Sequence, residues 1–163
     1  EEGGVHPDVG LYILGTVQEE IGSRGAKTAG FNLAPRTALV IDMGVATDYP
    51  RARPQDQGQL DLGKGPGISQ GSNTNPVVLD LLISAARDKG IAWPQQATGG
   101  TSPTDARVVQ ELQGGVATGV ISVPLRYMHT PCEVIDLADL DRTAQLAAAH
   151  CRRIRPDTDF CPR

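Results

Sequence analysis

The chain of 163 residues carries a net charge of −4 at pH 7, and hydrophobic residues make up 39% of it. This length and composition predict one globular domain with its own hydrophobic core. The acidic balance argues against a nucleic acid partner, because phosphate binding requires clustered Lys and Arg. No apolar run approaches the roughly 20 residues that a membrane-spanning helix requires, which argues against a membrane protein.

Three cysteines, Cys132, Cys151 and Cys161, form no C-x-x-C pair, and their odd number leaves at least one thiol unpaired. Reduced thiols are typical of intracellular proteins, so the cytoplasm is the expected location. Residues 1–4 contain neither an initiator Met nor a basic region followed by an apolar one. We therefore expect no signal peptide, and a chain cut from a longer one.

The first part of the chain contains two apolar runs, residues 9–17 and residues 37–41, and the second run ends at Asp42. Short apolar runs of this kind predict buried strands. Between them a helix is expected from Ser23, as its N-cap, to Leu33.

The segment 44–71 is rich in Pro, Gly and polar residues, which predicts a long loop; in a compact domain such loops are usually functional. After it, Asn75 as the cap and Pro76 at the first helical position predict a helix that ends at Gly90. Its apolar face is expected to contain Val78, Leu81, Leu82 and Ala85.

The remainder of the chain continues this alternation of strands and helices. Strands are expected at residues 91–94 and 116–123, with a short helix at 104–112 between them. Asp139 is expected to cap a final amphipathic helix. Strands that alternate with helices predict an α/β domain whose sheet is at least partly parallel.

Carboxylates and one imidazole follow the expected strands: Glu19 and Glu20 after the first, Asp42 after the second, and His129 in a loop beyond the last. Ligands gather outside the carboxyl ends of strands in open α/β sheets, so these side chains are candidates for a common site. Mixed oxygen and nitrogen donors suit zinc, cobalt or manganese, with one Glu left free as a general base. Taken alone, a Glu pair is more often a solvated turn, and a single His is more often a packed or surface residue.

Three segments carry a more specific signal. Residues 17–26 read V-Q-E-E-I-G-S-R-G-A, residues 41–50 read I-D-M-G-V-A-T-D-Y-P, and residues 124–134 read P-L-R-Y-M-H-T-P-C-E-V. In this order they resemble the signatures of the glutamyl and tetrahedral aminopeptidases, a family of dinuclear metallopeptidases whose members have sometimes been named as cellulases. Gly-Pro-Gly-Ile at 65–68 and Gly-Gly-Thr at 99–101 also have counterparts in that family.

The resemblance implies that Glu19 is the general base, that Glu20 and His129 share one metal, and that Asp42 binds the other. It also implies a three-layer, zinc-peptidase-like α/β sandwich with a mixed, partly parallel sheet. The cofactors would be two divalent ions, zinc or cobalt, in a full-length enzyme that removes N-terminal residues from peptides by means of a metal-activated water. Family members form homo-oligomers, from dimers to dodecamers. Substrate contacts are implied for Gly99, Gly100, Thr101 and Asp105.

Some parts of the family pattern have no counterpart in this chain. The family has an upstream metal-binding His and an Asp that bridges the two metals, and neither His6 nor Asp8 has the corresponding context. The inserted β-barrel domain of the family is also absent. We therefore interpret residues 1–154 as the C-terminal portion of the catalytic domain, an incomplete sandwich, followed by an irregular tail at 155–163. We expect this chain alone to bind two metals poorly and to have little peptidase activity.

Two other functions compete with this interpretation. A glycoside hydrolase, such as an endoglucanase, also uses two carboxyl groups. Such enzymes usually line the sugar site with aromatic rings, and this chain has only one Trp, three Tyr and two Phe. The other alternative is a non-catalytic domain that serves only assembly.

Overall fold

The computed structural model describes residues 4–162, and residues 1–3 and 163 of the expected N-terminal and tail segments lie outside it. Its centre is a five-stranded mixed sheet. The strand order is β1 (Thr37–Val45), β4 (Ala117–Arg126), β2 (Gly67–Gly71) and β3 (Gln95–Thr98), while β5 (Val134–Ile135) pairs with the end of β4. The pairs β1–β4 and β2–β3 are parallel, and β2–β4 and β4–β5 are antiparallel.

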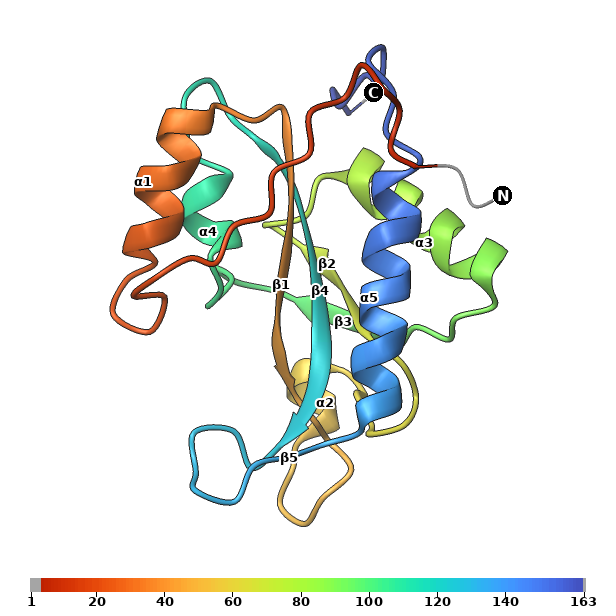
Figure 1. The fold of residues 1–163 in the computed structure, drawn as a ribbon. Helices are drawn as coiled ribbons and strands as arrows, with labels where there is room; N and C mark the ends of the chain where they lie inside the picture. Colours follow the sequence, from red (N-terminus) through yellow and green to blue (C-terminus); the bar gives the residue numbers. More distant parts are fainter. Residues whose placement is uncertain (1–3, 163) are drawn as a thin grey trace.

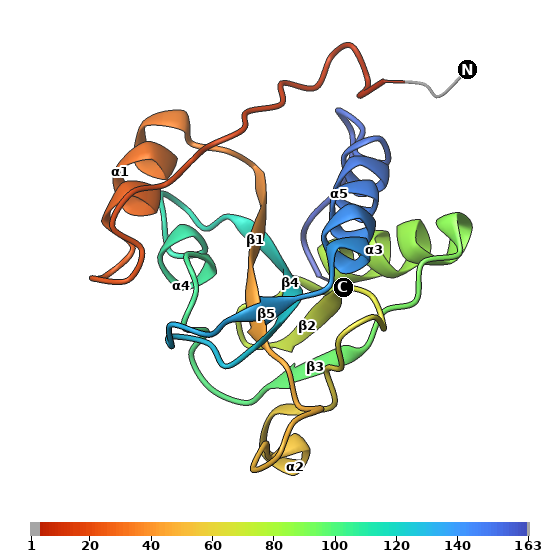
Figure 2. The same cartoon turned by 60° about the horizontal axis from the view of Figure 1, so that its bottom comes forward.

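Helices cover both faces of this sheet. The helices α1 (Arg24–Leu33) and α4 (Ala106–Val109) lie on one face, and α3 (Pro76–Lys89) and α5 (Leu137–Cys151) lie on the other (Figures 1 and 2). The short α2 (Pro54–Gln57) lies in the connection between β1 and β2. The expected three-layer α/β sandwich with a mixed sheet is therefore confirmed. No helix of residues 4–162 is long and apolar enough to cross a membrane.

Each helical layer has its own hydrophobic core against the sheet. The larger core joins α3 and α5 to β2 and β4, and it contains Ile68, Val78, Leu82, Ile121 and Leu146. The smaller core lies under α1 and α4 and contains Ala26, Val109, Leu112 and Val116. Burial of such aliphatic side chains stabilises a fold by about 1.5–3 kcal/mol each, which compensates for the shortage of aromatic residues.

The helix α3 begins and ends as its sequence predicts. The Asn75 side chain accepts hydrogen bonds from the amides of Val77 and Val78, at 2.9 and 3.3 Å, and so satisfies two free N–H groups of the first turn. Gly90 ends the helix in the left-handed conformation that glycine adopts without strain. Of the predicted apolar face, Leu81 is only half-buried, and Leu79 is buried instead.

The N-terminal prediction was wrong. Residues 9–17 form no strand, and several of their apolar side chains are exposed, including Ile13 at 91%. The physical reason is pairing: an apolar run becomes a strand only when a neighbour takes its backbone hydrogen bonds, and no described strand does so. Ser23 precedes α1 as expected but forms no side-chain cap, because its own backbone is left-handed, with φ 53°.

Other boundaries also differ from prediction. β1 continues through Asp42 to Val45, so this carboxylate lies within a strand and not after its end. The expected loop 44–71 contains α2 and ends in β2, a strand too rich in Gly and polar residues to be recognised. The strand expected at 91–94 begins only at Gln95, since Pro94 has no N–H to donate.

The helix α5 begins earlier than expected because its cap is Asp136, whose side chain accepts from the amide of Ala138 at 2.8 Å. The predicted cap, Asp139, is instead fully buried inside the helix. Its carboxylate accepts hydrogen bonds from the amides of Gly63 and Gly65, at 2.6 and 2.9 Å. Arg142 also donates to it, at 3.0 Å. Asp139 therefore holds the loop before β2 onto α5.

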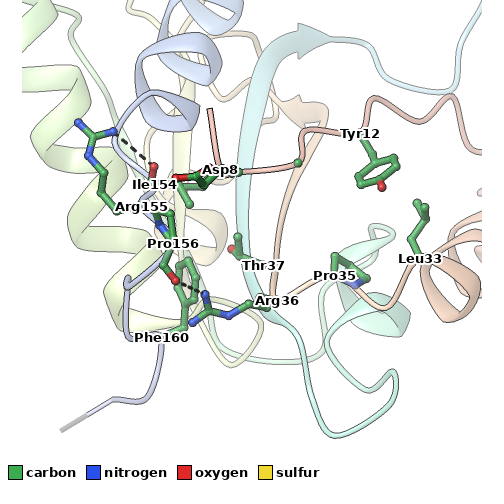
Figure 3. A pocket seen from close by; sticks show the side chains of 12 residues that line it. Asp8, Tyr12, Leu33, Pro35, Arg36, Thr37, Ile154, Arg155, Pro156 and Phe160 are labelled. Atoms are coloured by element: carbon green, nitrogen blue, oxygen red, sulfur yellow. Dashed lines mark hydrogen bonds between the residues drawn. The ribbon is translucent and has the colours of Figure 1, made fainter. Parts of the chain in front are cut away.

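Residues 152–162 form no further helix or strand, but they pack against the domain. The guanidinium of Arg36 donates to the carbonyls of Pro156 and Thr158, both at 2.8 Å, and lies over the ring of Phe160. Asn75 donates to the Phe160 carbonyl at 2.9 Å. A pocket of about 270 Å³ separates this tail from the N-terminal segment (Figure 3).

Replacing Asp139 with Ala should lower the free energy of unfolding by about 3 kcal/mol, because two buried amides and Arg142 lose a charged acceptor. Urea denaturation measures this change. Asp141 lies exposed on the same helix, so Asp141→Ala is the matched control and should change stability by less than about 0.5 kcal/mol. Equal stability of the two variants would show that the loop contact does not matter.

His150 should make the fold sensitive to acid. It is buried at the end of α5 with no hydrogen-bond partner for Nδ1, and burial, with a smaller effect of the Arg153 charge, lowers its pKa from 6.5 to about 4. Because the folded pKa is below the unfolded one, the unfolded state binds the proton first. Stability is therefore complete above pH 6.5 and falls by roughly 3 kcal/mol toward pH 4.

Denaturant midpoints measured between pH 7 and pH 4 for the wild type and His150→Gln test this prediction. The wild type should lose stability more steeply than the variant, which has no imidazole to protonate. Parallel pH curves for the two proteins would contradict it.

Candidate functional site

The side chains of Glu20 and His129 meet although 109 residues separate them. Glu20 lies in the turn before α1, and His129 lies in the turn after β4. The His129 Nε2 is 3.2 Å from the Glu20 Oε1, and both side chains are largely exposed. Two ligands of one tetrahedral zinc ion are expected about 3.3 Å apart, given bond lengths near 2.0–2.2 Å. The two side chains are within hydrogen-bond distance of each other, and their spacing is also compatible with two donors to one cation.

The turn that carries Glu19 and Glu20 is closed by backbone hydrogen bonds. The amides of Gly22 and Ser23 donate to the Glu19 carbonyl at 3.0 and 2.9 Å, and the amide of Gly25 donates to Val17 at 2.9 Å. The backbones of Gly25 and Val17 approach so closely that a Cβ on Gly25 would lie 2.5 Å from the Val17 nitrogen. Only glycine permits this approach, so the backbone turn that carries Glu19 and Glu20 depends on Gly25.

Asp42 lies half-buried in the middle of β1, opposite Ser122 of β4. Its Oδ1 accepts a hydrogen bond from the amide of Met43 at 2.7 Å. Burial raises the pKa of Asp42, the hydrogen bond from Met43 lowers it, and the charges of Asp105 and Glu20 raise it further. Asp42 is thus within electrostatic reach of the Glu20 turn.

Glu19 belongs to the same acidic neighbourhood. Burial raises its pKa, and the charges of Asp42, Asp105 and Glu20 raise it further, whereas Arg107 lowers it. Four carboxylates and one nearby cationic side chain form a region of negative potential, which attracts cations. Within residues 4–162, however, no three His, Cys, Asp or Glu side chains converge closely enough to hold a metal ion. The structure brings Glu20 and His129 into contact, and it brings Glu19 and Asp42 only into their neighbourhood.

The predicted substrate-contact residues fall into two groups. Gly99 and Gly100 are exposed in a loop, where the hydroxyl of Ser72 donates to the Gly100 carbonyl at 2.7 Å. Asp105 lies deeper, at the start of α4, and accepts a hydrogen bond from the hydroxyl of Thr16 at 2.6 Å. Asp105 therefore contacts the segment that leads to Glu19.

Sequence reasoning did not identify the residues that hold the His129 turn. Arg126, the last residue of β4, donates to both carboxylate oxygens of Asp48, which lowers the pKa of that carboxyl. The rings of Tyr49 and Tyr127 lie 5.0 Å apart at the same place. The backbone amide of His129 donates to Glu133 at 2.7 Å. These residues lie inside the matched segments, but nothing in their spacing predicts that they pair.

The pocket of Figure 3 is a separate feature. Arg36, just before β1, and Thr37, its first residue, contribute to the wall of this pocket, together with the tail residues Pro156 and Phe160. None of the eight predicted site residues lines it. The candidate site is accordingly the exposed acidic region between the Glu20 turn, β1 and the His129 turn.

Residues 3–146 match the sequence pattern of the M42 glutamyl aminopeptidases. The chain belongs to this family. A lysyl aminopeptidase of Pyrococcus furiosus is 38% identical over 154 residues, which are 93% of this chain and 43% of that protein. The predicted family membership is confirmed.

Solved structures agree with this assignment. An aminopeptidase from the archaeon Desulfurococcus kamchatkensis matches with a TM-score of 0.76 and 39% identity, over 85% of this chain and 40% of that chain. The TET1 peptidase of Pyrococcus horikoshii, which can assemble into a tetrahedron or a large octahedral shell, matches with a TM-score of 0.64 and 26% identity. That match covers 85% of this chain and 40% of that chain. The chain thus spans less than half of the length of each of these M42 relatives.

Replacing Gly25 with Ala should open the turn that carries Glu19 and Glu20, because the new methyl group meets the backbone of Val17 and not a movable side chain. Amide hydrogen exchange of Ser23 and of residue 25, measured by NMR, should become at least about tenfold faster. Gly114→Ala is the control, since a Cβ there meets nothing within 4 Å. Unchanged exchange in the Gly25 variant would contradict the turn's dependence on this glycine.

Proposed function

We propose that this chain is the metal-binding part of an aminopeptidase that removes N-terminal residues from peptides, with Glu19 as the general base. The observation that carries the proposal is the contact between Glu20 and His129, at 3.2 Å, directly beside Glu19. Each of these residues lies in a segment that matches the M42 family. The adjacent Glu19 lies within electrostatic reach of two further carboxylates, Asp42 and Asp105, which supports the proposal.

The donor set fits divalent cations of the zinc or cobalt kind. Glu20 and His129 would hold one ion, and Asp42 would contribute to a second. When bound, such ions polarise the scissile carbonyl and lower the pKa of a water molecule. Since no three donors converge within residues 4–162, we propose that this chain alone binds metal weakly and has little activity.

Glu19 would move the proton of the reaction. Its carboxylate would accept a proton from the attacking water and then give it to the nitrogen of the departing peptide. Glu20 cannot do both tasks, because its Oε1 already faces His129. In this proposal Glu20 is the metal ligand and Glu19 is the general base.

The exposed loop of Gly99, Gly100 and Thr101 is proposed to contact the peptide backbone.

The family assignment overturns the glycoside hydrolase alternative. The imidazole of His129 beside Glu20 has no place in a mechanism that needs two carboxyl groups across a sugar bond. The alternative of a non-catalytic domain that serves only assembly predicts instead that the protein hydrolyses no aminoacyl p-nitroanilide.

We also propose that the protein forms a homo-oligomer and that it is located in the cytoplasm. The free thiols of Cys132, Cys151 and Cys161 support the proposed location.

In the product of the complete gene, Glu19→Gln should keep the bound metal but lower kcat at least about 100-fold, because the amide cannot accept the proton. Hydrolysis of L-leucine p-nitroanilide, with metal content from elemental analysis, measures both effects. Glu111→Gln, an exposed glutamate outside the site, is the control. A Glu19 variant with kcat close to that of the control would exclude the base role, and release of sugar from carboxymethylcellulose would revive the hydrolase alternative.

A further inference from the structure

The loop that carries His129 joins two paired strands. β4 and β5 are antiparallel neighbours, with Arg126 opposite Val134, and residues 127–133 connect them as the loop of a hairpin (Figure 1). Glu133 is the last residue of this loop. Its side chain turns back across the loop, and its Oε1 accepts a hydrogen bond from the backbone amide of His129 at 2.7 Å. Glu133 therefore ties the backbone of His129 to the start of β5.

The other hydrogen bonds within this loop hold the neighbours of His129. Thr130 donates to the carbonyl of Tyr127 from its amide, at 3.2 Å, and from its hydroxyl, at 2.7 Å. The amide of Cys132 donates to the Thr130 hydroxyl at 3.3 Å. None of these bonds involves His129 itself, whereas the contact with Glu133 acts directly on its backbone.

The backbone of His129 needs such a contact. It is left-handed, with φ 62°, a conformation that a residue with a side chain keeps only where its surroundings hold it. The carboxylate of Glu133 is a charged acceptor, and hydrogen bonds to charged groups are roughly twice as strong as those between neutral groups. Without this acceptor, the φ angle of His129 is free to return to an ordinary negative value. That rotation would carry the imidazole away from Glu20, whose Oε1 lies 3.2 Å from its Nε2.

The position of Glu20 does not depend on this loop. Glu20 lies in a turn closed by its own backbone hydrogen bonds, in which the amides of Gly22 and Ser23 donate to the Glu19 carbonyl. The distance between the two proposed ligands is thus set from one side by that turn and from the other side by Glu133. Loss of a contact that orients a metal ligand typically lowers metal affinity by roughly 10- to 100-fold.

We propose that Glu133 is a positioning residue for metal binding: it fixes the backbone of His129 so that the imidazole stays beside Glu20, and it thereby raises the affinity for a divalent cation. This inference rests on the proposed function, in which Glu20 and His129 hold one ion. Glu133 acts through a backbone amide and adds no donor to the metal site. Its hydrogen bond, and not its charge, is what the site requires.

Calorimetric titration of the metal-free product of the complete gene with Co²⁺ tests this role. Glu133→Ala should bind one Co²⁺ about tenfold more weakly than the wild type, because the His129 amide loses its acceptor. Glu133→Gln should bind within about threefold of the wild type, since its amide oxygen still accepts the hydrogen bond. The control Glu111→Ala, which removes an exposed glutamate outside the site, should also bind within about threefold. These variants should keep the urea midpoint of the wild type, because Glu133 and Glu111 are both exposed.

Two results would overturn the role of Glu133. One is a Glu133→Ala variant that binds Co²⁺ as tightly as the Glu111→Ala control. The other is a Glu133→Gln variant that loses as much affinity as Glu133→Ala, which would assign the effect to charge. His129→Ala tests the proposed ligand role separately and should lose more affinity than Glu133→Ala. A wild type without affinity for Co²⁺, or a His129→Ala variant that binds as well as the wild type, would overturn the proposed ligand set and this inference with it. If His129→Ala loses affinity and Glu133→Ala does not, the inference alone fails.

Discussion

The parallel pairing of β1 with β4 is the contact on which the rest of the structure depends. Its nine paired positions place Asp42 of β1 opposite Ser122 of β4, and β4 then leads directly into the turn of His129. Side chains alternate between the faces of a strand, so a slip of one residue would turn Asp42 to the other face. Close packing opposes such a slip, because Gly119 leaves only enough room for Val78 and Leu82 of α3.

The strand β4 also contacts helices of both helical layers. Almost every residue of β4 is buried, and α3 and α5 pack on one of its faces while α4 packs on the other. In contrast, β1 has its outer edge free in the described sheet, and several of its residues are only half-buried. The exposed apolar run 9–17 lies on this side of the molecule, before α1 (Figure 2). The larger hydrophobic core lies on the face of the sheet that carries α3 and α5.

Local signals predicted the elements whose stability is local. The Asn75 cap and the Gly90 stop of α3 depend on a few neighbouring residues, so the sequence alone located both ends. The start of α5 could not be found in the same way, because Asp136 and Asp139 are equally suitable caps. The loop of Gly63 and Gly65, more than 70 residues away, decides between them. The strand expected at 9–17 was wrong for a similar reason, since strand formation depends on a partner.

In the candidate site, too, some features could be predicted from the sequence and others depend on distant contacts. Motif resemblance identified Glu19, Glu20 and His129, and the fold brings Glu20 and His129 together across 109 residues. Resemblance gave no reason to expect that Arg126 would bind Asp48, 78 residues earlier. Nor could it show that the Asp105 side chain makes no cap hydrogen bond to α4 and keeps one oxygen buried. Such contacts arise from the packing of distant segments, so sequence motifs alone cannot predict them.

The turn of His129 shows why these supporting contacts matter. Both Tyr127 and His129 have left-handed backbones, with φ of 59° and 62°. Such a conformation costs about 1–3 kcal/mol per residue and persists only where the surrounding contacts hold it. The Asp48–Arg126 pair holds the beginning of the turn, and the hydrogen bond to Glu133 holds its end. These contacts hold the turn in the conformation in which the imidazole of His129 lies beside Glu20. The turn places the imidazole of His129 3.2 Å from Glu20, which is the position that the proposed ligand role requires.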